Sequence, residues 1–311
     1  MDHSFPSPAS RLQEKLSAGQ FVITAEVTPP VSCDAGDLLE KALPLRGLVD
    51  AVNVTDGASA RAHMSAPIAA AMLARAGLEP VLQLACRDRN RIALEGELMG
   101  AAACGIGNIL CLTGDDPKAG DQPETKPVFD LDAAALMRIA RDLREKGELP
   151  SGRKVAGTAQ FFIGAADLPI DPPATWRADR LAAKAAAGAQ FAQTQFCMDK
   201  EIVRRYAARL KEHPGLAGFF LLIGVSPLRS AKSARWMRNH LRGTIIPEAL
   251  VERLDRAADP AAEGERICVE LIEELAQVPG IAGAHVMAPA NDAAVPRVAA
   301  EARRRLGRLH C

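Results

Sequence analysis

The segment NILCLTGDDP (residues 108–117) joins an apolar run to a turn that carries two carboxylates. Residues 108–114 suit a buried β-strand, and the Gly-Asp-Asp-Pro sequence then ends it. Asp115 stands at the exit of this strand either as an ordinary turn former or as part of a site, and the segment alone leaves both interpretations open. The fold is indicated by the repetition of this pattern along the chain.

Further β-rich runs share this character, and they lie at residues 21–28, 50–56, 79–86, 154–161, 189–196, 218–225 and 281–288. Between the runs lie Ala-, Leu- and Arg-rich segments with helical spacing of apolar residues, such as 131–147 and 199–213. Strands that alternate with helices predict a parallel sheet, and eight strands are the number that closes a (β/α)8 TIM barrel of the α/β class. An open doubly wound sheet is the alternative, but no strand is followed by a G-x-G-x-x-G turn.

We expect one catalytic domain over residues 1–311, in which residues 1–18 form an N-terminal extension. Residues 243–280 contain two helical patterns where a barrel needs one helix. They are therefore predicted to be a helical insertion between strands seven and eight.

Composition excludes several classes of function. Lys plus Arg and Asp plus Glu both number 38, so the formal net charge is zero and neither nucleic acid nor an anionic membrane is an expected partner. The basic segment 229–243, which contains one Trp, fits a solvated barrel helix. No apolar run is long enough to span a bilayer, and residues 1–10 lack the apolar core of a signal peptide. The 7 cysteines are scattered without a CxxC pair and the 6 histidines are dispersed, which predicts a reducing cytoplasm and no metal site.

In a barrel the carboxyl ends of the strands carry the chemistry. Glu26 lies within strand one between apolar neighbours, where desolvation would raise its pKa and suit it to act as a general acid; a salt-bridged carboxylate is the equal alternative. Lys184, on a helix, is either a phosphate contact or a solvated charge. The glutamines Gln193 and Gln195 of strand six either satisfy backbone groups or bind a ligand. His285 is interpreted as a satisfied core histidine.

Four segments in register then become recognisable: FVITAEVTPP, AVNVTDGA, LCLTGDDP and KAAAGAQFAQTQFCMD. Together they resemble the methylenetetrahydrofolate reductase family in its short bacterial form, from about Phe21 to Pro227 and more loosely to Ala288. The resemblance implies a barrel that reduces 5,10-methylenetetrahydrofolate to 5-methyltetrahydrofolate in one-carbon metabolism and methionine biosynthesis. It also implies FAD at the carboxyl ends of the strands, with NADH or NADPH supplying the hydride.

The resemblance carries roles onto individual positions. Glu26 matches the acid that protonates the folate as its methylene bridge opens to a 5-iminium ion, Asp115 matches an aspartate that hydrogen-bonds the pterin, and Gln195 matches a glutamine that also holds it. Further positions match cofactor contacts of the family, and these are Thr55, Gln83, Gly114, Asp115 and Lys184.

Several positions depart from the family pattern. Gln83 stands where many members have His, Thr113 where they have Arg, and Arg177 where an Asp is common ahead of the lysine on helix five. Most of these positions serve FAD, so direct transfer from nicotinamide to the iminium, without flavin, is kept as an alternative. A non-catalytic folate-binding partner subunit and a pterin-using methyltransferase are others. The run RDRNR (87–91) either contacts cofactor phosphates or begins a solvated helix, and the sequence leaves open whether the chain forms a homo-oligomer.

Overall fold

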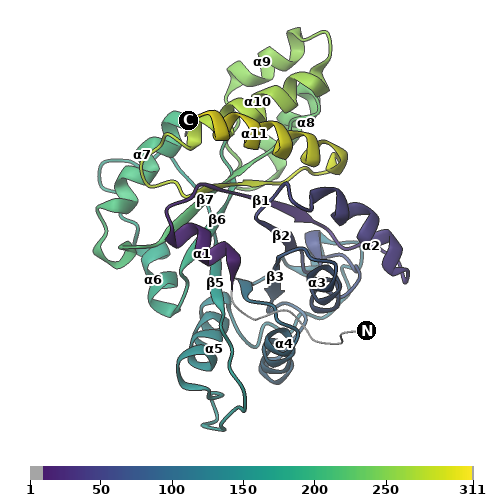
Figure 1. The fold of residues 1–311 in the computed structure, drawn as a ribbon, viewed down its shortest axis with the longest axis vertical. Helices are drawn as coiled ribbons and strands as arrows, with labels where there is room; N and C mark the ends of the chain where they lie inside the picture. The colour runs from purple at the N-terminus through teal and green to yellow at the C-terminus, as the bar shows by residue number, and fades with distance from the viewer. Residues whose placement is uncertain (1–9, 310–311) are drawn as a thin grey trace.

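Eight parallel strands form a closed barrel in the computed structural model, which describes residues 10–309 (Figure 1). The strands are β1 (Val22–Val27), β2 (Ala51–Val54), β3 (Pro80–Ala85), β4 (Asn108–Leu112), β5 (Phe162–Asp167), β6 (Phe191–Phe196), β7 (Phe220–Val225) and β8 (Gly283–Val286). Every neighbouring pair is parallel, and β8 closes the barrel on β1. The predicted (β/α)8 barrel is therefore confirmed.

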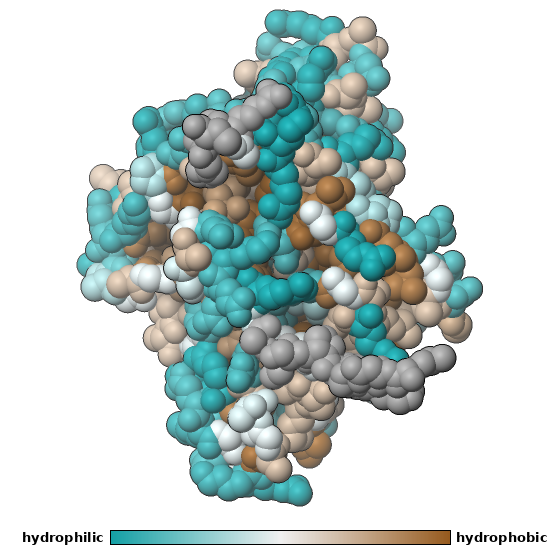
Figure 2. All heavy atoms as spheres, viewed as in Figure 1, coloured by the Kyte–Doolittle hydropathy of each residue, from teal (hydrophilic) through white to brown (hydrophobic). Residues whose placement is uncertain are grey.

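Helices surround the strands (Figure 1). They are α1 (Arg11–Ser17), α2 (Ala35–Ala42), α3 (Ala66–Arg75), α4 (Arg91–Ala103), α5 (Ala133–Lys146), α6 (Asp179–Ala187), α7 (Lys200–Lys211), α8 (Ala231–His240), α9 (Glu248–Arg256), α10 (Pro260–Leu275) and α11 (Val295–Leu309). Figure 2 shows mostly hydrophilic residues on the outer helices in the same view, with hydrophobic residues exposed mainly between them. Within residues 10–309, no helix combines the length and apolar character needed to cross a membrane.

The prediction for strand five is wrong. Residues 154–161 do not form a barrel strand: Lys154 makes an isolated antiparallel bridge with Glu148, and Gly157 has a φ of +89°. The strand is the next segment, β5, whose first four residues are buried. A strand covered on both faces reads as a continuous apolar run, whereas 154–161 alternates as a half-exposed strand would. The alternation in 154–161 was therefore the misleading signal.

One end of the barrel is closed by α1. Leu12 and Leu16 of this helix are buried, and Ser10 caps it by accepting a hydrogen bond from the N–H of Gln13. The two leucines pack in one apolar cluster with residues from the first half of the strands, which are Val22, Ala51, Val81, Leu110, Phe162, Phe191 and Leu222. The described part of the predicted extension 1–18 is thus a plug under the barrel; residues 1–9 lie outside the described residues.

Additional helices between strands seven and eight are confirmed, but their arrangement differs from the predicted insertion at 243–280. Three helices, α8, α9 and α10, occupy this connection. The last of them, α10, packs against both β7 and β8, and Ile267, Cys268 and Leu271 are among its buried residues. It is therefore the barrel's own helix. The added elements are α8 and α9, and α9 lies at the far end of the molecule from α5 (Figure 1).

Candidate active site at the carboxyl ends of the strands

A buried layer of polar side chains crosses the barrel above its apolar floor. The Gln193 amide donates to Oδ1 of Asn53 at 2.9 Å and to Oγ1 of Thr24 at 3.1 Å, and its Oε1 accepts from Nδ2 of Asn53 at 2.6 Å. Thr24 and Asn53 have no exposed surface, and Gln193 and His285 are nearly as buried. Amides that satisfy one another in this way can remain buried without the cost of unpaired polar groups.

Hydrogen bonds within the same layer bear on which ring nitrogen of His285 carries the proton. Oγ1 of Thr24 lies 2.9 Å from Nδ1 of His285. The amide Nε2 of Gln193 also lies 3.4 Å from Nδ1, so this ring nitrogen faces an amide donor as well as a hydroxyl that can donate. An imidazole that accepts at Nδ1 carries its proton on Nε2. The hydrogen-bond pattern therefore favours the Nε2–H tautomer of neutral His285.

Glu26 lies at the end of β1, directly above this layer. Its side chain is 27% exposed, and its Oε2 is 3.9 Å from Nε2 of His285. Nε2 of Gln83 donates to the same oxygen at 3.2 Å. The carboxylate is thus held by Gln83, faced by His285 and partly open to solvent. Gln83, predicted as a cofactor contact, here positions the acid; a cofactor contact by Gln83 stays a prediction.

The sequence left open whether the carboxylates after β4 form a turn or belong to a site, and the structure gives the two residues different surroundings. Asp116 is the turn former: it caps the short 3-10 helix η3 (Pro117–Ala119) and accepts a hydrogen bond from the N–H of Lys118 at 2.9 Å. Asp115 is exposed and makes no hydrogen bond or ion pair within residues 10–309. Its carboxylate is therefore available to a ligand.

Gly114 is required by its backbone and by its neighbours. Its φ is +93°, and a Cβ at this position would lie 2.9 Å from Cβ of Arg87 and 3.3 Å from Cβ of Ala85. Both values are closer than side chains pack. The glycine thus lets the strand exit turn tightly against Arg87, which places Asp115 at the rim.

Two further predicted residues present unused polar groups. Thr55 is buried, and its Oγ1 has no hydrogen-bond partner among the described residues. Gln195 is half-buried at the end of β6, where a register irregularity follows Gln193. Its Oε1 accepts from the N–H of Phe196 at 3.0 Å, which leaves its NH2 group without a partner in the described part of the chain. A buried hydroxyl and an amide in this state are groups that a ligand could satisfy.

The run RDRNR is largely engaged with the protein itself. Arg87 pairs with Asp88, and Arg89 makes two hydrogen bonds to Asp56, of 2.5 and 3.0 Å. Asn90 caps α4. These contacts favour the structural interpretation of the run over phosphate binding.

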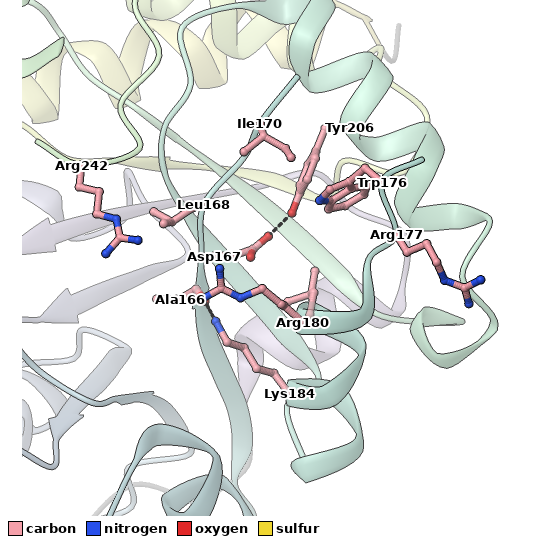
Figure 3. Close-up of a pocket in the computed structure, with 11 residues that line it drawn as sticks. Ala166, Asp167, Leu168, Ile170, Trp176, Arg177, Arg180, Lys184, Tyr206 and Arg242 are labelled. Atoms are coloured by element: carbon pink, nitrogen blue, oxygen red, sulfur yellow. Dashed lines mark hydrogen bonds between the residues drawn. The ribbon is translucent and has the colours of Figure 1, made fainter. Parts of the chain in front are cut away.

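Lys184 lies apart from the other predicted residues. It projects from α6 and its Nζ donates to the carbonyl oxygen of Ala166 at 2.5 Å. It lines a cavity of about 440 Å³ beside the end of β5 (Figure 3). Burial lowers the pKa of Lys184, and Arg180 adds to this effect while Asp167 opposes it.

The structure therefore joins Glu26 directly to Gln83. Thr55, Asp115 and Gln195 follow or end strands on the same rim, and within residues 10–309 no hydrogen bond or ion pair joins them. The prediction that His285 is a satisfied core histidine is confirmed, because the ring is buried and hydrogen-bonded to Thr24. The sequence did not indicate that its other ring nitrogen faces Glu26. The available signal was a lone histidine inside an apolar strand that neighbours the strand of Glu26 in a closed barrel. Within residues 10–309, no cluster of three or more His, Cys, Asp or Glu side chains could hold a metal ion.

Comparison with known proteins places these observations in context. The chain is 26% identical over 223 residues to a probable methylenetetrahydrofolate reductase (NADPH) of Caenorhabditis elegans, a match that covers 68% of this chain and 30% of that protein. The chain thus spans less than a third of that relative's length.

Two solved structures share the fold. An uncharacterized protein from Clostridium thermocellum, which binds two copies of 5-methyl-5,6,7,8-tetrahydrofolic acid, superposes with a TM-score of 0.64 at 12% identity, over 94% of this chain and 98% of the other. A 2,3-dimethylmalate lyase superposes with a TM-score of 0.50 at 16% identity, over 98% and 88% of the two chains.

A family model described as methylenetetrahydrofolate reductase matches residues 11–303. The match includes every barrel strand and every predicted site residue. The chain therefore belongs to the methylenetetrahydrofolate reductase family.

Proposed function

We propose that this protein reduces 5,10-methylenetetrahydrofolate to 5-methyltetrahydrofolate with electrons from NADH or NADPH. The observation that carries the proposal is the placement of Glu26, an accessible carboxylate held by Gln83 and faced by the Nε2–H of His285. A non-catalytic folate-binding subunit has no need of such an acid. The family membership and the folate-binding barrel from Clostridium thermocellum support folate as the substrate class.

The reaction needs one proton and one hydride. The bond between the methylene carbon and N10 breaks, its electron pair stays on N10, and Glu26 supplies the proton that N10 takes up. The methylene carbon is left as an iminium with N5, and it becomes a methyl group when it receives the hydride. Glu26 is then a carboxylate, and the neighbouring N–H of His285 stabilises that charge.

The rest of the mouth orients the folate. The carboxylate of Asp115 offers two acceptors to the amino-pyrimidine edge of the pterin, and the free NH2 of Gln195 offers a donor to its carbonyl or ring nitrogens. Because these groups come from β4 and β6 while Glu26 comes from β1, they would fix the pterin across the mouth. Its bridge would then lie over the acid.

The residues present also fit a dinucleotide cofactor. The unpartnered hydroxyl of Thr55 and the amino group of Lys184 would hold a flavin and its phosphates. Bound FAD would supply hydride transfer between the nicotinamide and the folate. The engagement of Gln83 with Glu26, together with the departures at Thr113 and Arg177, favours a second route in which the nicotinamide occupies this place itself.

A spectrophotometric experiment tests the proposal. The purified chain is mixed with NADH or NADPH, and oxidation of the nicotinamide is followed on addition of 5,10-methylenetetrahydrofolate. We expect oxidation that depends on folate, with 5-methyltetrahydrofolate as the product. Folate binding without oxidation would instead indicate the non-catalytic subunit, and methyl transfer without oxidation would indicate a methyltransferase. The visible spectrum of the purified protein separates the flavin route, which gives a yellow sample, from the direct route.

A further inference from the structure

The outward face of α4 carries no charged side chain. After Arg91, the exposed residues of this helix are Ile92, Ala93, Gly96, Met99, Gly100 and Ala103. Their spacing of three and four positions places them on one side of the helix. The exposed residues of α7, by contrast, include Glu201, Arg204 and Arg205. We call the uncharged surface formed by these exposed residues of α4 the α4 face.

Two glycines lie in the middle of the α4 face. Gly96 and Gly100 occupy interior positions of a regular helix, where glycine is less favourable than alanine because it loses more backbone freedom on folding. Among the described residues outside the backbone of α4 itself, no atom lies within 4 Å of a Cβ built at either position. Packing inside one molecule therefore does not require these glycines. A second helix against the face would, because glycine lets another backbone approach closely.

Large apolar side chains are exposed beside the glycines. Ile92 is 79% exposed and Met99 is 37% exposed. They stand seven positions apart, so they lie along one edge of the α4 face. On the neighbouring helix α3, Ile68 is 54% exposed. A single exposed hydrophobic residue is ordinary, but a group of them on one surface is typical of a protein interface.

The ends of α4 favour an antiparallel partner helix. The helix has no acidic residue in its first turn and no basic residue in its last turn. Arg91 stands at its N-terminus instead, where the positive end of the helix dipole disfavours a cation. An antiparallel helix would bring its negative C-terminal end to Arg91, and its N-terminal end to Ala103. A second copy of α4 supplies both contacts, because a two-fold axis makes them identical.

A two-fold axis at Gly96 gives each edge of the α4 face a matching partner. In an antiparallel pair, residues on one edge of a helix meet those of the same edge of the other helix, about equally far beyond the axis. Ile92 would pack against Met99 of the second copy, and Ala93 would pack against Gly100 of the second copy. Large side chains thus meet along one edge, and small residues meet along the other, where the backbones come closest.

We propose that this protein forms a symmetric homodimer in which the α4 faces of two copies pack antiparallel about an axis at Gly96. The helix has 13 residues and is about 20 Å long. A contact between one such face from each copy belongs to the small interfaces, below about 1,200 Å² in total, so we expect the dimer to dissociate reversibly. The interface lies on the outside of the barrel, so the proposal does not depend on the reductase function.

Sedimentation equilibrium of the full chain over micromolar concentrations tests the dimer. Gly96→Glu would set two carboxylates against each other at the axis, and we expect it to raise the dissociation constant roughly 30-fold or more. Glutamate suits a helix better than glycine, so circular dichroism should show that the variant is folded. Gly307→Glu is the matched control. Gly307 is an exposed glycine of α11 with nothing within 4 Å of a built Cβ, and Figure 1 places α11 at the top of the molecule and α4 at the bottom.

A pair of opposite charges tests the antiparallel register. Ile92→Glu and Met99→Lys should each weaken self-association, because each removes an apolar contact and buries an unpaired charge. The two variants mixed in equal amounts should associate again. In the mixed dimer the introduced carboxylate meets the introduced amine, while the other pair of contacts keeps its native residues. A parallel pair of helices would give no such recovery, since positions 92 and 99 would lie at different heights.

A chain that stays monomeric at every concentration would overturn the proposal, as would a dimer that Gly96→Glu leaves intact. Equal weakening by Gly307→Glu would count against it too, because that substitution lies outside the α4 face. Failure of the Ile92→Glu and Met99→Lys mixture to associate would overturn the antiparallel arrangement.

Discussion

His285 and Glu26 face each other across the junction of β8 and β1, with Nε2 of the ring 3.9 Å from Oε2 of the carboxylate. The distance is longer than a hydrogen bond, and a modest rotation of Glu26 would close it. Because Thr24 holds the other ring nitrogen, the imidazole cannot turn away without breaking a buried hydrogen bond. The acid of the proposed reaction is thus coupled to a fixed donor rather than to a mobile one.

Glu26→Gln should abolish the proton supply while preserving the shape of the side chain. We expect kcat for folate reduction to fall by about 10²- to 10⁴-fold, the usual contribution of a general acid, with little change in folate affinity. Steady-state kinetics and equilibrium titration with 5-methyltetrahydrofolate measure the two quantities. Turnover at the wild-type rate would remove Glu26 from the chemistry.

The pair Asp115 and Asp116 allows a matched comparison. Asp115→Asn should weaken folate binding with little effect on stability, because the side chain is exposed and makes no hydrogen bond or ion pair within residues 10–309. Asp116→Ala should do the reverse and lower the free energy of unfolding by about 1 kcal/mol, because it removes a helix cap. Isothermal titration and chemical denaturation of both variants test the assignment. An unchanged folate affinity in Asp115→Asn would reduce that residue to part of the turn.

Tyr206 predicts a dependence of stability on alkaline pH. Burial, followed by the negative charge of Asp167, raises the pKa of Tyr206. A raised pKa in the folded state means that the stabilisation is complete below the pKa of an unfolded tyrosine, about 10, and declines as the pH rises above it.

We therefore expect Tyr206→Phe to lower the free energy of unfolding by about 1–2 kcal/mol at neutral pH, because it leaves Asp167 without its donor. The difference in the free energy of unfolding between the variant and the wild type should become smaller above a pH of about 10. Denaturant unfolding at a series of pH values measures this difference. A difference that grows with pH would contradict a raised pKa of Tyr206.

Gly164 supports the barrel interior by having no side chain. A Cβ at this position would lie 2.4 Å from the ring of Phe191, which stacks on Phe162 at a centroid distance of 4.5 Å. Gly164→Ala should lower the free energy of unfolding by about 1–3 kcal/mol through overpacking. The double variant with Phe191→Leu should recover part of that loss, since it removes the ring that the new methyl group meets. If the losses in the free energy of unfolding of the two single variants simply added in the double variant, the clash between the new methyl group and the Phe191 ring would not be the cause.

Most of the barrel could be predicted from sequence because buried strands appear as apolar runs and amphipathic helices appear as apolar residues spaced about every 3 to 4 positions. Strand five could not, because residues 154–161 imitate a half-exposed strand immediately before the true one. Periodicity identifies the presence of an element better than its bounds. The predicted strand was placed several residues too early, on a segment that contains Gly157 with its positive φ, and the true strand begins at Phe162.

The site was predictable in part for the same reason. Glu26, Thr55 and Gln195 each lie near the carboxyl end of a predicted strand. Because these ends meet at one rim of a barrel, the sequence is enough to place the three residues on the same side of the molecule. Their partners do not follow: Thr24 and His285 are 261 residues apart and meet only through the closure of β8 on β1. Likewise, only the coordinates distinguish the capping role of Asp116 from that of its free neighbour.

Within residues 10–309, α1 covers one end of a barrel whose interior is packed, so ligands of the proposed site would enter at the carboxyl ends of the strands. Reactants and products must use the same opening, so a molecule seated deep in the mouth cannot depart while another covers it. We would then expect the ligand that binds last to leave first, because the packed floor of strand residues and α1 leaves no passage through the barrel in the described part of the chain.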